Sequence, residues 1–180
     1  MKRRRAFTVI DNLITFAIIF VLAAILIPVF MKGWDNARRS SCQANLKHIS
    51  VALWMYVADN NGYSPARNWD ASLKPYIKND RVFRCPSKSG EQGTSDYFFN
   101  ARYLKKPLHK LDNLASSATP ILLGDGSDGG ALAGFPESWR TDENSSARRH
   151  MGGGCYSFAD GRIKWLEPQQ VSSDFREVSR

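Results

Sequence analysis

Residues 13–31 form an uninterrupted apolar segment, LITFAIIFVLAAILIPVFM, that contains no charged side chain. A helix of about 20 apolar residues is long enough to cross the hydrocarbon core of a bilayer. The pattern therefore predicts one membrane-spanning helix near the N-terminus. The rest of the chain is polar enough for a water-exposed domain.

A second hydrophobic pattern follows, because residues 36–58 contain neither glycine nor proline. Apolar side chains recur there at spacings of four, three, four and three, which places them on one helical face: Cys42, Leu46, Ile49, Leu53 and Tyr56. Asn60-Asn61-Gly62 is a helix stop signal. We therefore expect residues 32–62 to be an amphipathic continuation of the first helix, with its apolar face packed on a domain.

That domain is predicted to span residues 63–168, a length sufficient for one modest core. Its expected strands are residues 97–103, 120–124, 155–158 and 162–166. The last two flank Ala159-Asp160-Gly161, which is a good hairpin turn. Tyr156 and Phe158 are expected on one side of this hairpin, with Ile163 and Trp165 as their partners across it. Residues 169–180 are predicted to be a polar tail, whose composition is compatible with disorder.

The predicted fold class is therefore α+β, a long N-terminal helix packed on a small antiparallel sheet. The segment 1–31 does not fit a secretory signal, since its apolar run is too long and no A-x-A cleavage pattern follows it. Four basic residues precede the run, and by the positive-inside rule they hold the N-terminus in the cytoplasm: Lys2, Arg3, Arg4 and Arg5. A smaller group beyond it opposes this orientation: Lys32, Arg38 and Arg39.

The segment Arg5-Ala6-Phe7-Thr8-Val9-Ile10-Asp11 resembles the leader of type IV prepilins. The resemblance implies that a membrane peptidase cuts between Ala6 and Phe7 and that the new amine of Phe7 is methylated. Residues 1–6 are then a cleaved leader, and residues 7–31 are a transmembrane and assembly helix. Two residues depart from the family pattern: Ala6 stands where glycine is usual, and Asp11 stands where glutamate is usual.

Further motifs resemble bacterial prepilin-like proteins with an H-x9-D-G element near the C-terminus. They are Ser41-Cys42-Gln43-Ala44-Asn45-Leu46-Lys47 with Tyr56, Asp59 and Gly62; Phe83-Arg84-Cys85-Pro86-Ser87; and His150 with Asp160-Gly161. The resemblance implies the pilin-like architecture more than any activity of the head. The alternative for the last element is structural: Asp160-Gly161 makes a turn, and His150 hydrogen-bonds a loop.

Two residues of the apolar helix are candidates for a role in assembly. An ionisable group within an apolar helix costs about 2.5–3.5 kcal/mol on insertion scales and usually has a partner, and the amine of a processed neighbouring subunit suits Asp11. The alternative places Asp11 at the headgroup level, in contact with water. Pro28 removes one backbone hydrogen bond and is expected to kink or locally open the helix. The alternative is a kinked anchor helix without a role in assembly.

The head is expected in an oxidising compartment, where disulfides persist. Cys42 lies on the helical stripe that faces the head, and Cys85 lies in a proline-flanked loop, so we predict a Cys42–Cys85 disulfide. Cys155 stands where the resembled family more often has a polar residue, and it is expected to be unpaired. The alternative is three reduced, buried thiols.

The sequence gives little support for catalysis or metal binding. No nucleophile motif such as G-x-S-x-G is present, and three His and three Cys lack the spacings typical of zinc sites. No cofactor is expected; a weaker candidate is a calcium site formed by Asp125, Asp128 and Asp160.

The formal net charge is +8, and loss of the leader's four basic residues lowers it by four to +4. Such an excess is compatible with nucleic-acid binding. Arg148-Arg149-His150 and Lys105-Lys106 are the clusters in the head. Scattered solvated basic residues explain the excess better.

These observations lead to a structural hypothesis rather than an enzymatic one. The resemblance implies a subunit that waits in the bacterial inner membrane and then joins copies of itself or related pilins in an extracellular, type IV pilus-like filament. Two alternatives remain open: a pseudopilin of a type II secretion system, acting in a periplasmic pseudopilus, and a membrane-anchored binding or adhesion domain that does not polymerise.

Overall fold

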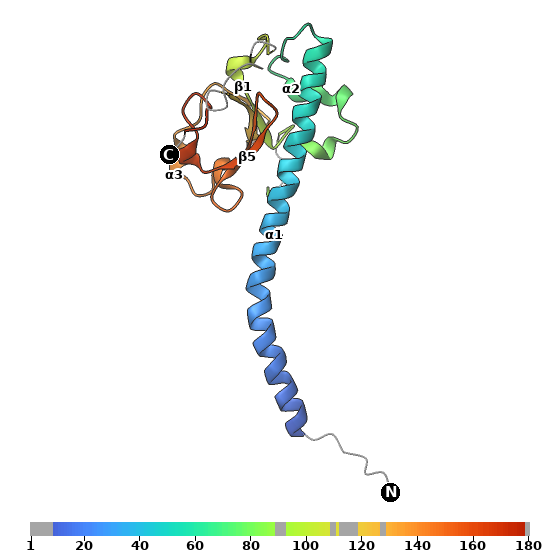
Figure 1. Ribbon diagram of the computed structural model, residues 1–180, viewed down its shortest axis with the longest axis vertical. Helices are drawn as coiled ribbons and strands as arrows, with labels where there is room; N and C mark the ends of the chain where they lie inside the picture. Colours follow the sequence, from blue (N-terminus) through green and yellow to red (C-terminus); the bar gives the residue numbers. More distant parts are fainter. Residues whose placement is uncertain (1–8, 89–92, 109–110, 112–118, 127–128, 179–180) are drawn as a thin grey trace. The chain divides into compact units, whose positions relative to one another are not determined.

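The computed structural model describes residues 9–88, 93–108, 111, 119–126 and 129–178. These residues divide into two compact units, with the boundary between Asn36 and Ala37. The first unit is entirely helical in its described part, and it belongs to α1, which begins at Val9 and ends at Asp59 (Figure 1). The second unit begins with the remainder of α1 and contains the sheet.

In the second unit, α1 is followed by short helices and five strands. The helices are α2 (Trp69–Leu73), η1 (Lys74–Tyr76), η2 (Asp80–Phe83), η3 (Ala101–Tyr103), α3 (Ser138–Thr141), η4 (Ser146–Arg148) and η5 (Pro168–Gln170). The strands are β1 (Tyr97–Asn100), β2 (Ile121–Asp125), β3 (Ala131–Leu132), β4 (Gly154–Phe158) and β5 (Ile163–Leu166). The strand order in the sheet is β3-β1-β2-β4-β5.

The α+β fold class is confirmed, as are the four predicted strand regions. The pairs β1–β2, β2–β4 and β4–β5 are antiparallel. One strand was not predicted: β3 lies in the glycine-rich segment after β2 and pairs parallel with β1. The sheet is therefore mixed rather than purely antiparallel. With only two residues, β3 is too short for a hydrophobic alternation to show it.

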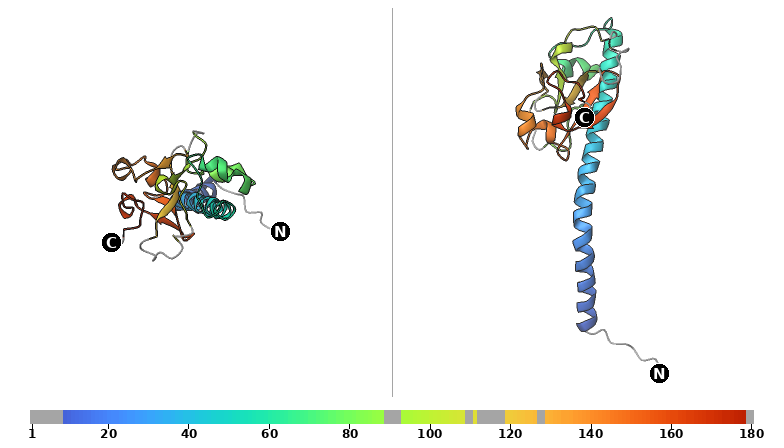
Figure 2. Two further views of the ribbon diagram at one scale, coloured as in Figure 1. Left: turned by 90° about the horizontal axis from the view of Figure 1, so that it is seen from above. Right: turned by 60° about the vertical axis from the view of Figure 1, so that its left-hand side comes forward.

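The amphipathic part of α1 covers one face of the sheet. Its buried residues are Cys42, Leu46, Ile49, Ser50, Ala52, Leu53 and Val57. Four of the five predicted stripe residues are among them, while Tyr56 is only partly buried and Val57 takes the last position. Figures 1 and 2 show this part of α1 (cyan) beside the sheet. Burial of each Leu or Ile side chain stabilises the packing by about 1.5–3 kcal/mol.

α1 ends at Asp59, directly before the predicted stop signal Asn60-Asn61-Gly62. The N–H of Gly62 donates to the carbonyl of Val57 at 2.8 Å. Both Asn61 (φ 55°) and Gly62 (φ 82°) adopt left-handed backbone conformations, which Asn and Gly tolerate best.

The opposite face of the sheet carries a second core that includes the C-terminal segment. Its buried residues are Phe98, Ile121, Phe135, Ala147, Tyr156, Phe158, Leu166, Val171 and Phe175. Phe175 accepts a backbone hydrogen bond from Ile121 at 2.8 Å, and its ring centroid lies 4.9 Å from that of Phe98. The interpretation of residues beyond 168 as a separate polar tail is therefore wrong for residues 169–178, because two apolar side chains in this segment close the second core.

The β4–β5 hairpin has a different register from the predicted one. Tyr156 pairs with Lys164, Cys155 with Trp165, and Ser157 with Ile163. Tyr156 therefore faces the second core, while Ile163 and Trp165 pack against the first core, on the side of α1. The predicted pairing of Tyr156 and Phe158 with Ile163 and Trp165 is wrong, because both faces of β4 are buried and the apolar pattern does not fix the phase of the pairing.

Candidate functional site

The residues predicted for processing and assembly lie in the first unit or before it. Ala6 and Phe7 lie outside the described residues. Asp11 is exposed on α1, and its backbone carbonyl accepts a hydrogen bond from the Thr15 hydroxyl at 2.8 Å. No side chain described between residues 9 and 36 is buried. By length and composition, α1 is the one described helix that is able to cross a membrane.

Pro28 lies inside this helix without ending it. α1 remains helical on both sides of Pro28, so the predicted local opening of the helix is not found. The ring still removes one backbone N–H and leaves the carbonyl four residues earlier without that donor. What Pro28 contributes to assembly stays a prediction.

In the second unit, a disulfide joins the two cysteines that the sequence analysis pairs. Cys42 and Cys85 are both buried, and their Cα atoms lie 5.4 Å apart. Two hydrogen bonds position the loop that carries Cys85: Asn45 of α1 donates to the carbonyl of Arg84 at 2.8 Å, and the N–H of Cys85 donates to Asp96 at 2.9 Å. The disulfide therefore fixes this loop to the amphipathic part of α1.

Two further residues complete a buried polar cluster around the disulfide. The cluster consists of Cys42, Cys85, Asp125 and His150, each at most 2% exposed. His150 Nε2 lies 3.4 Å from Cys85 Sγ and 3.3 Å from Asp125 Oδ2. One sulfur, nitrogen or oxygen atom from each of the four residues lies within 4.8 Å of the others.

A surrounding layer of polar groups orients the cluster. His150 Nδ1 lies 3.3 Å from the Ser87 hydroxyl, and Asp125 Oδ2 accepts from the N–H of Cys155 at 2.6 Å. Asp125 Oδ1 has no hydrogen-bond partner among the described residues, although Arg149 Nη1 lies 3.7 Å from it. The free thiol of Cys155 is buried beside this layer. Burial, followed by the charge of Asp125, raises the pKa of the Cys155 thiol far above its usual range, which favours the protonated thiol.

The two ends of the H-x9-D-G element have separate positions. His150 joins the buried cluster, and its carbonyl accepts from Trp165 Nε1 at 2.7 Å. Asp160 and Gly161 form the turn between β4 and β5, where Gly161 has φ 79° and Asp160 accepts from the N–H of Arg162 at 3.0 Å. Lys47 of α1 donates to the Gly161 carbonyl at 2.9 Å. The element thus attaches the hairpin to α1 at Gly161 and, through His150, to the loop that carries Cys85 and Ser87, in agreement with the structural alternative.

The candidate calcium ligands are not brought together. Asp125 lies beside Cys155 near the start of β4, and its carboxylate is part of the buried cluster. Asp160 follows the other end of β4 and forms an ion pair with Arg162. Asp128 lies outside the described residues. The calcium hypothesis therefore has no support from the positions of Asp125 and Asp160.

The main basic cluster of the head is largely internal. Arg149 is an interior side chain that donates to the carbonyls of Asp96 and Gly126, and His150 belongs to the buried cluster. Arg148 donates to the carbonyl of Arg140 at 2.8 Å. These three residues hold loops of the head together, and the proposed role in nucleic-acid binding gains no support from them.

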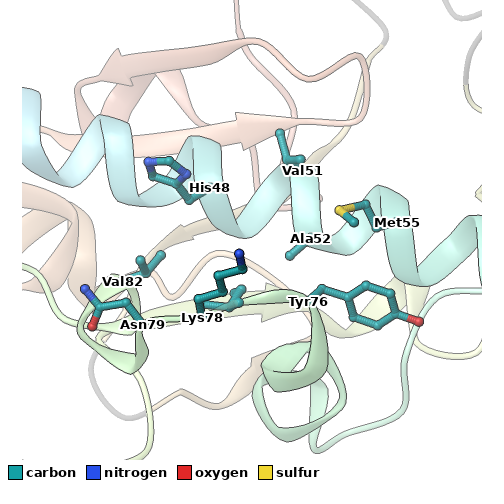
Figure 3. Close-up of a pocket in the computed structure, with 9 residues that line it drawn as sticks. His48, Val51, Ala52, Met55, Tyr76, Lys78, Asn79 and Val82 are labelled. Atoms are coloured by element: carbon teal, nitrogen blue, oxygen red, sulfur yellow. The ribbon is translucent and has the colours of Figure 1, made fainter.

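A groove lies between α1 and the η1–η2 segment (Figure 3). His48, Val51 and Met55 of α1 form one side, with Tyr76 and Lys78 opposite. Val51 and Met55 are each 49% exposed. The sequence analysis did not single out this groove, because Val51 and Met55 fall off the buried stripe. It is the kind of apolar surface that a binding domain would use.

Comparison with known proteins gives partial matches to filament proteins. The chain is 33% identical over 89 residues to the type IV major pilin protein PilA of Myxococcus xanthus, covering 49% of this chain and 40% of the relative. It is 38% identical over 64 residues to the type IV wide pilus major component PilA4 of Thermus thermophilus, covering 36% of this chain and 49% of the relative.

A third relative belongs to a secretion system. The chain is 35% identical over 65 residues to the type II secretion system core protein G of Pseudomonas aeruginosa, covering 35% of this chain and 46% of the relative. The chain thus spans less than half the length of each of these relatives. No family model and no solved structure matches it significantly.

Proposed function

We propose that the chain is a type IV pilin-like protein and a structural subunit of a type IV pilus-like filament, because parts of it are similar to type IV pilins. In this proposal the apolar part of α1 anchors the chain in the bacterial inner membrane before assembly. The same helix then packs against copies of itself or related pilins inside the filament. The head, residues 37–178, forms the outer surface.

One observation carries the proposal: the apolar helix is not covered by any described part of its own unit. Its Leu, Ile, Val and Phe side chains are about half to four-fifths exposed, from Leu26 at 49% to Val9 at 79%. Exposed apolar surface of this extent requires lipid or other protein around it. The bilayer surrounds the helix with lipid before assembly. A filament whose core consists of such helices then surrounds it with other protein.

The proposal includes processing by a prepilin peptidase. Cleavage between Ala6 and Phe7, followed by methylation of the Phe7 amine, yields a mature chain with Asp11 at its fifth position. Intact-mass analysis of protein extracted from membranes of the native host tests this step, since the expected mass lacks residues 1–6 and carries one methyl group. A chain that retains residues 1–6 in a host with an active peptidase would contradict it.

The decisive experiment is recovery of the protein from sheared surface filaments. We expect purified filaments to contain this chain as an identified subunit by peptide sequencing, and to disappear when its gene is deleted. A chain that is found only in the membrane fraction, while filaments persist without it, would instead support the membrane-anchored binding or adhesion domain, with the groove of Figure 3 as its candidate surface.

A pseudopilin role is the second candidate, because several relatives are type II secretion core proteins. The two roles share the helix and its assembly but differ in location and cargo. A deletion strain that keeps its surface filaments and accumulates secreted enzymes in the periplasm would identify the pseudopilin. Loss of surface filaments with normal secretion would identify the pilus subunit.

A further inference from the structure

The buried cluster of Cys42, Cys85, Asp125 and His150 contains the donor set of a tetrahedral metal site. Two thiolates, one imidazole nitrogen and one carboxylate oxygen are ligands that suit Zn²⁺. No local sequence motif indicates such a site, because the four ligands come from α1, the loop after η2, the end of β2 and the segment before β4. Only the fold brings them together.

We propose that the head binds one Zn²⁺ through these four residues when the Cys42–Cys85 disulfide is reduced. The disulfide and the metal are then alternative ways to hold Cys42 and Cys85 together. Oxidised protein keeps the loop and helix together by the covalent bond, and reduced protein keeps them together by the metal. The inference does not depend on the proposed filament function.

The distances between the ligand atoms are already close to those of a tetrahedral site. For ligands at about 2.0–2.3 Å from Zn²⁺, tetrahedral geometry separates an imidazole nitrogen from an oxygen or a sulfur by about 3.3–3.6 Å. His150 Nε2 lies 3.3 Å from Asp125 Oδ2 and 3.4 Å from Cys85 Sγ. The main required change is that the two sulfurs move apart to about 3.8 Å after reduction.

The outer layer also has the form expected around a zinc site. A zinc-bound histidine usually has its other ring nitrogen held by a polar group, and the Ser87 hydroxyl lies 3.3 Å from His150 Nδ1. The carboxylate of Asp125 is oriented by the N–H of Cys155 at 2.6 Å. Its other oxygen, Oδ1, accepts no hydrogen bond from the described residues but forms an ion pair with Arg149 Nη1 at 3.7 Å, which leaves Oδ2 on the side of His150.

A phosphine is a suitable reductant for the Cys42–Cys85 disulfide. The phosphine supplies two electrons, the Cys42–Cys85 bond breaks, and water supplies two protons to the sulfurs and one oxygen to the phosphine oxide. Binding of Zn²⁺ then releases both thiol protons to solvent, and His150 binds as the neutral imidazole. Oxidised glutathione restores the disulfide by thiol–disulfide exchange: it accepts the two electrons and two protons of the Cys42 and Cys85 thiols, becomes two glutathione thiols, and the loss of two ligands releases the Zn²⁺.

The test uses the full chain in detergent, reduced under anaerobic conditions and freed of phosphine. Thiol titration first verifies three free thiols; if the native disulfide resists, reduction is done in denaturant and the protein is refolded with and without Zn²⁺. We expect about one Zn²⁺ per reduced chain and none above background in oxidised protein. Co²⁺ should give the thiolate charge-transfer and intense d–d absorption of a tetrahedral site.

Variants separate the site from adventitious binding. His150→Gln and Asp125→Asn should lose the Co²⁺ spectrum, and Ser87→Ala should weaken binding by about 10–100-fold. His48→Ala is the matched control, because His48 is exposed on α1 and outside the cluster. Circular dichroism of each oxidised variant checks that the head is folded.

A second readout covers variants that fold poorly. In the unaltered reduced chain, Zn²⁺ should protect Cys42 and Cys85 from alkylation and slow their reoxidation, and a chelator should remove both effects. Equal alkylation with and without Zn²⁺, or a Co²⁺ spectrum unchanged in His150→Gln, would overturn the proposal.

Discussion

Residues 9–36 and residues 37–59 belong to one helix, but their side chains have opposite environments. In the first part no described side chain is buried, and Leu22 is 54% exposed. In the second part the apolar residues narrow to one stripe, and Leu46 is fully buried. Within the first part, residues 13–31 carry no charge and are not covered by the described residues of their own unit, whereas the second part packs on the sheet.

The two parts of α1 are therefore stabilised by different processes. The second part is stabilised during folding, by the first core and by the disulfide. The first part is not covered by the described residues of its own unit, and lipid or other subunits are able to cover it. Substitutions in the first part should therefore affect assembly and leave the stability of the head unchanged, while substitutions in the second part should do the reverse.

The largest expected effect concerns assembly and Asp11. Asp11→Ala should insert and be processed but fail to assemble, because the carboxylate that pairs with a neighbour's amine is absent. Asp11→Glu should assemble at least as well as the original chain. Filament yield after shearing measures the effect, with Asp35→Ala as the control, since Asp35 is another exposed acid of the same helix. Normal yield from Asp11→Ala would remove the proposed role.

The next effect is on the stability of the head and concerns the disulfide. The double variant Cys42→Ser/Cys85→Ser should lower the free energy of unfolding by about 4 kcal/mol, because the bond closes a loop with a sequence separation of 43 residues. Urea unfolding of the full chain in detergent, followed by tryptophan fluorescence, measures it.

Peptide mapping without reductant identifies the bond directly. It should recover the Cys42–Cys85 pair and a free Cys155 from native protein. A linkage of Cys155 to either of the other cysteines, or three free thiols in exported protein, would refute the assignment. Cys155→Ala is the matched control for unfolding, and it should cost much less than the double variant because no covalent loop is lost.

A matched pair of leucines tests the comparison inside α1 itself. Leu46→Ala should lower the free energy of unfolding of the head by about 2–5 kcal/mol, because it leaves a cavity in the first core. Leu22→Ala makes the same chemical change on the exposed part, and it should alter that free energy by no more than about 0.5 kcal/mol. Equal losses from the two variants would mean that Leu22 packs against the head.

The sequence predicted those features whose signals are local. The stripe of α1, its end at Asn61-Gly62 and the four principal strand regions follow from periodicity and turn residues. The phase of the β4–β5 pairing was predicted wrongly, because Tyr156 and Ile163 are both apolar and both faces of the sheet are buried. The role of Phe175 was missed because it stands in a polar segment whose partner, Phe98, is distant in sequence.

The buried cluster could not be predicted for a related reason. Zinc motifs are recognised by short spacings between ligands, whereas Cys42, Cys85, Asp125 and His150 are each separated by tens of residues. The family resemblance pointed to His150, and the reasoning on cysteines predicted the disulfide. Neither predicted that Asp125 lies beside both of them. The order of the strands supplies that information, since β2 lies beside β4 in the sheet.

The smallest expected effect is an alkaline loss of stability that belongs to Cys155. Burial raises the pKa of this thiol well above its ordinary value of 9.0. Below pH 9 the thiol is protonated in both folded and unfolded chains, so its contribution to stability is fully present. As the pH rises above 9, only the unfolded chain releases the proton, and the free energy of unfolding should fall by about 1.4 kcal/mol per pH unit.

The measurement compares the original chain with Cys155→Ala by urea unfolding at pH 8, 9 and 10. The difference between the two proteins isolates Cys155 from Tyr97 and Tyr156, whose pKa values burial also raises. The original chain should lose about 1.4 kcal/mol more than the variant between pH 8 and pH 10. Native protein should also react slowly with iodoacetamide at Cys155. Parallel pH profiles of the two proteins, or rapid alkylation of the folded chain, would show that the Cys155 thiol reaches solvent. The head would then not be closed around Cys155, in contrast to the burial described for this unit.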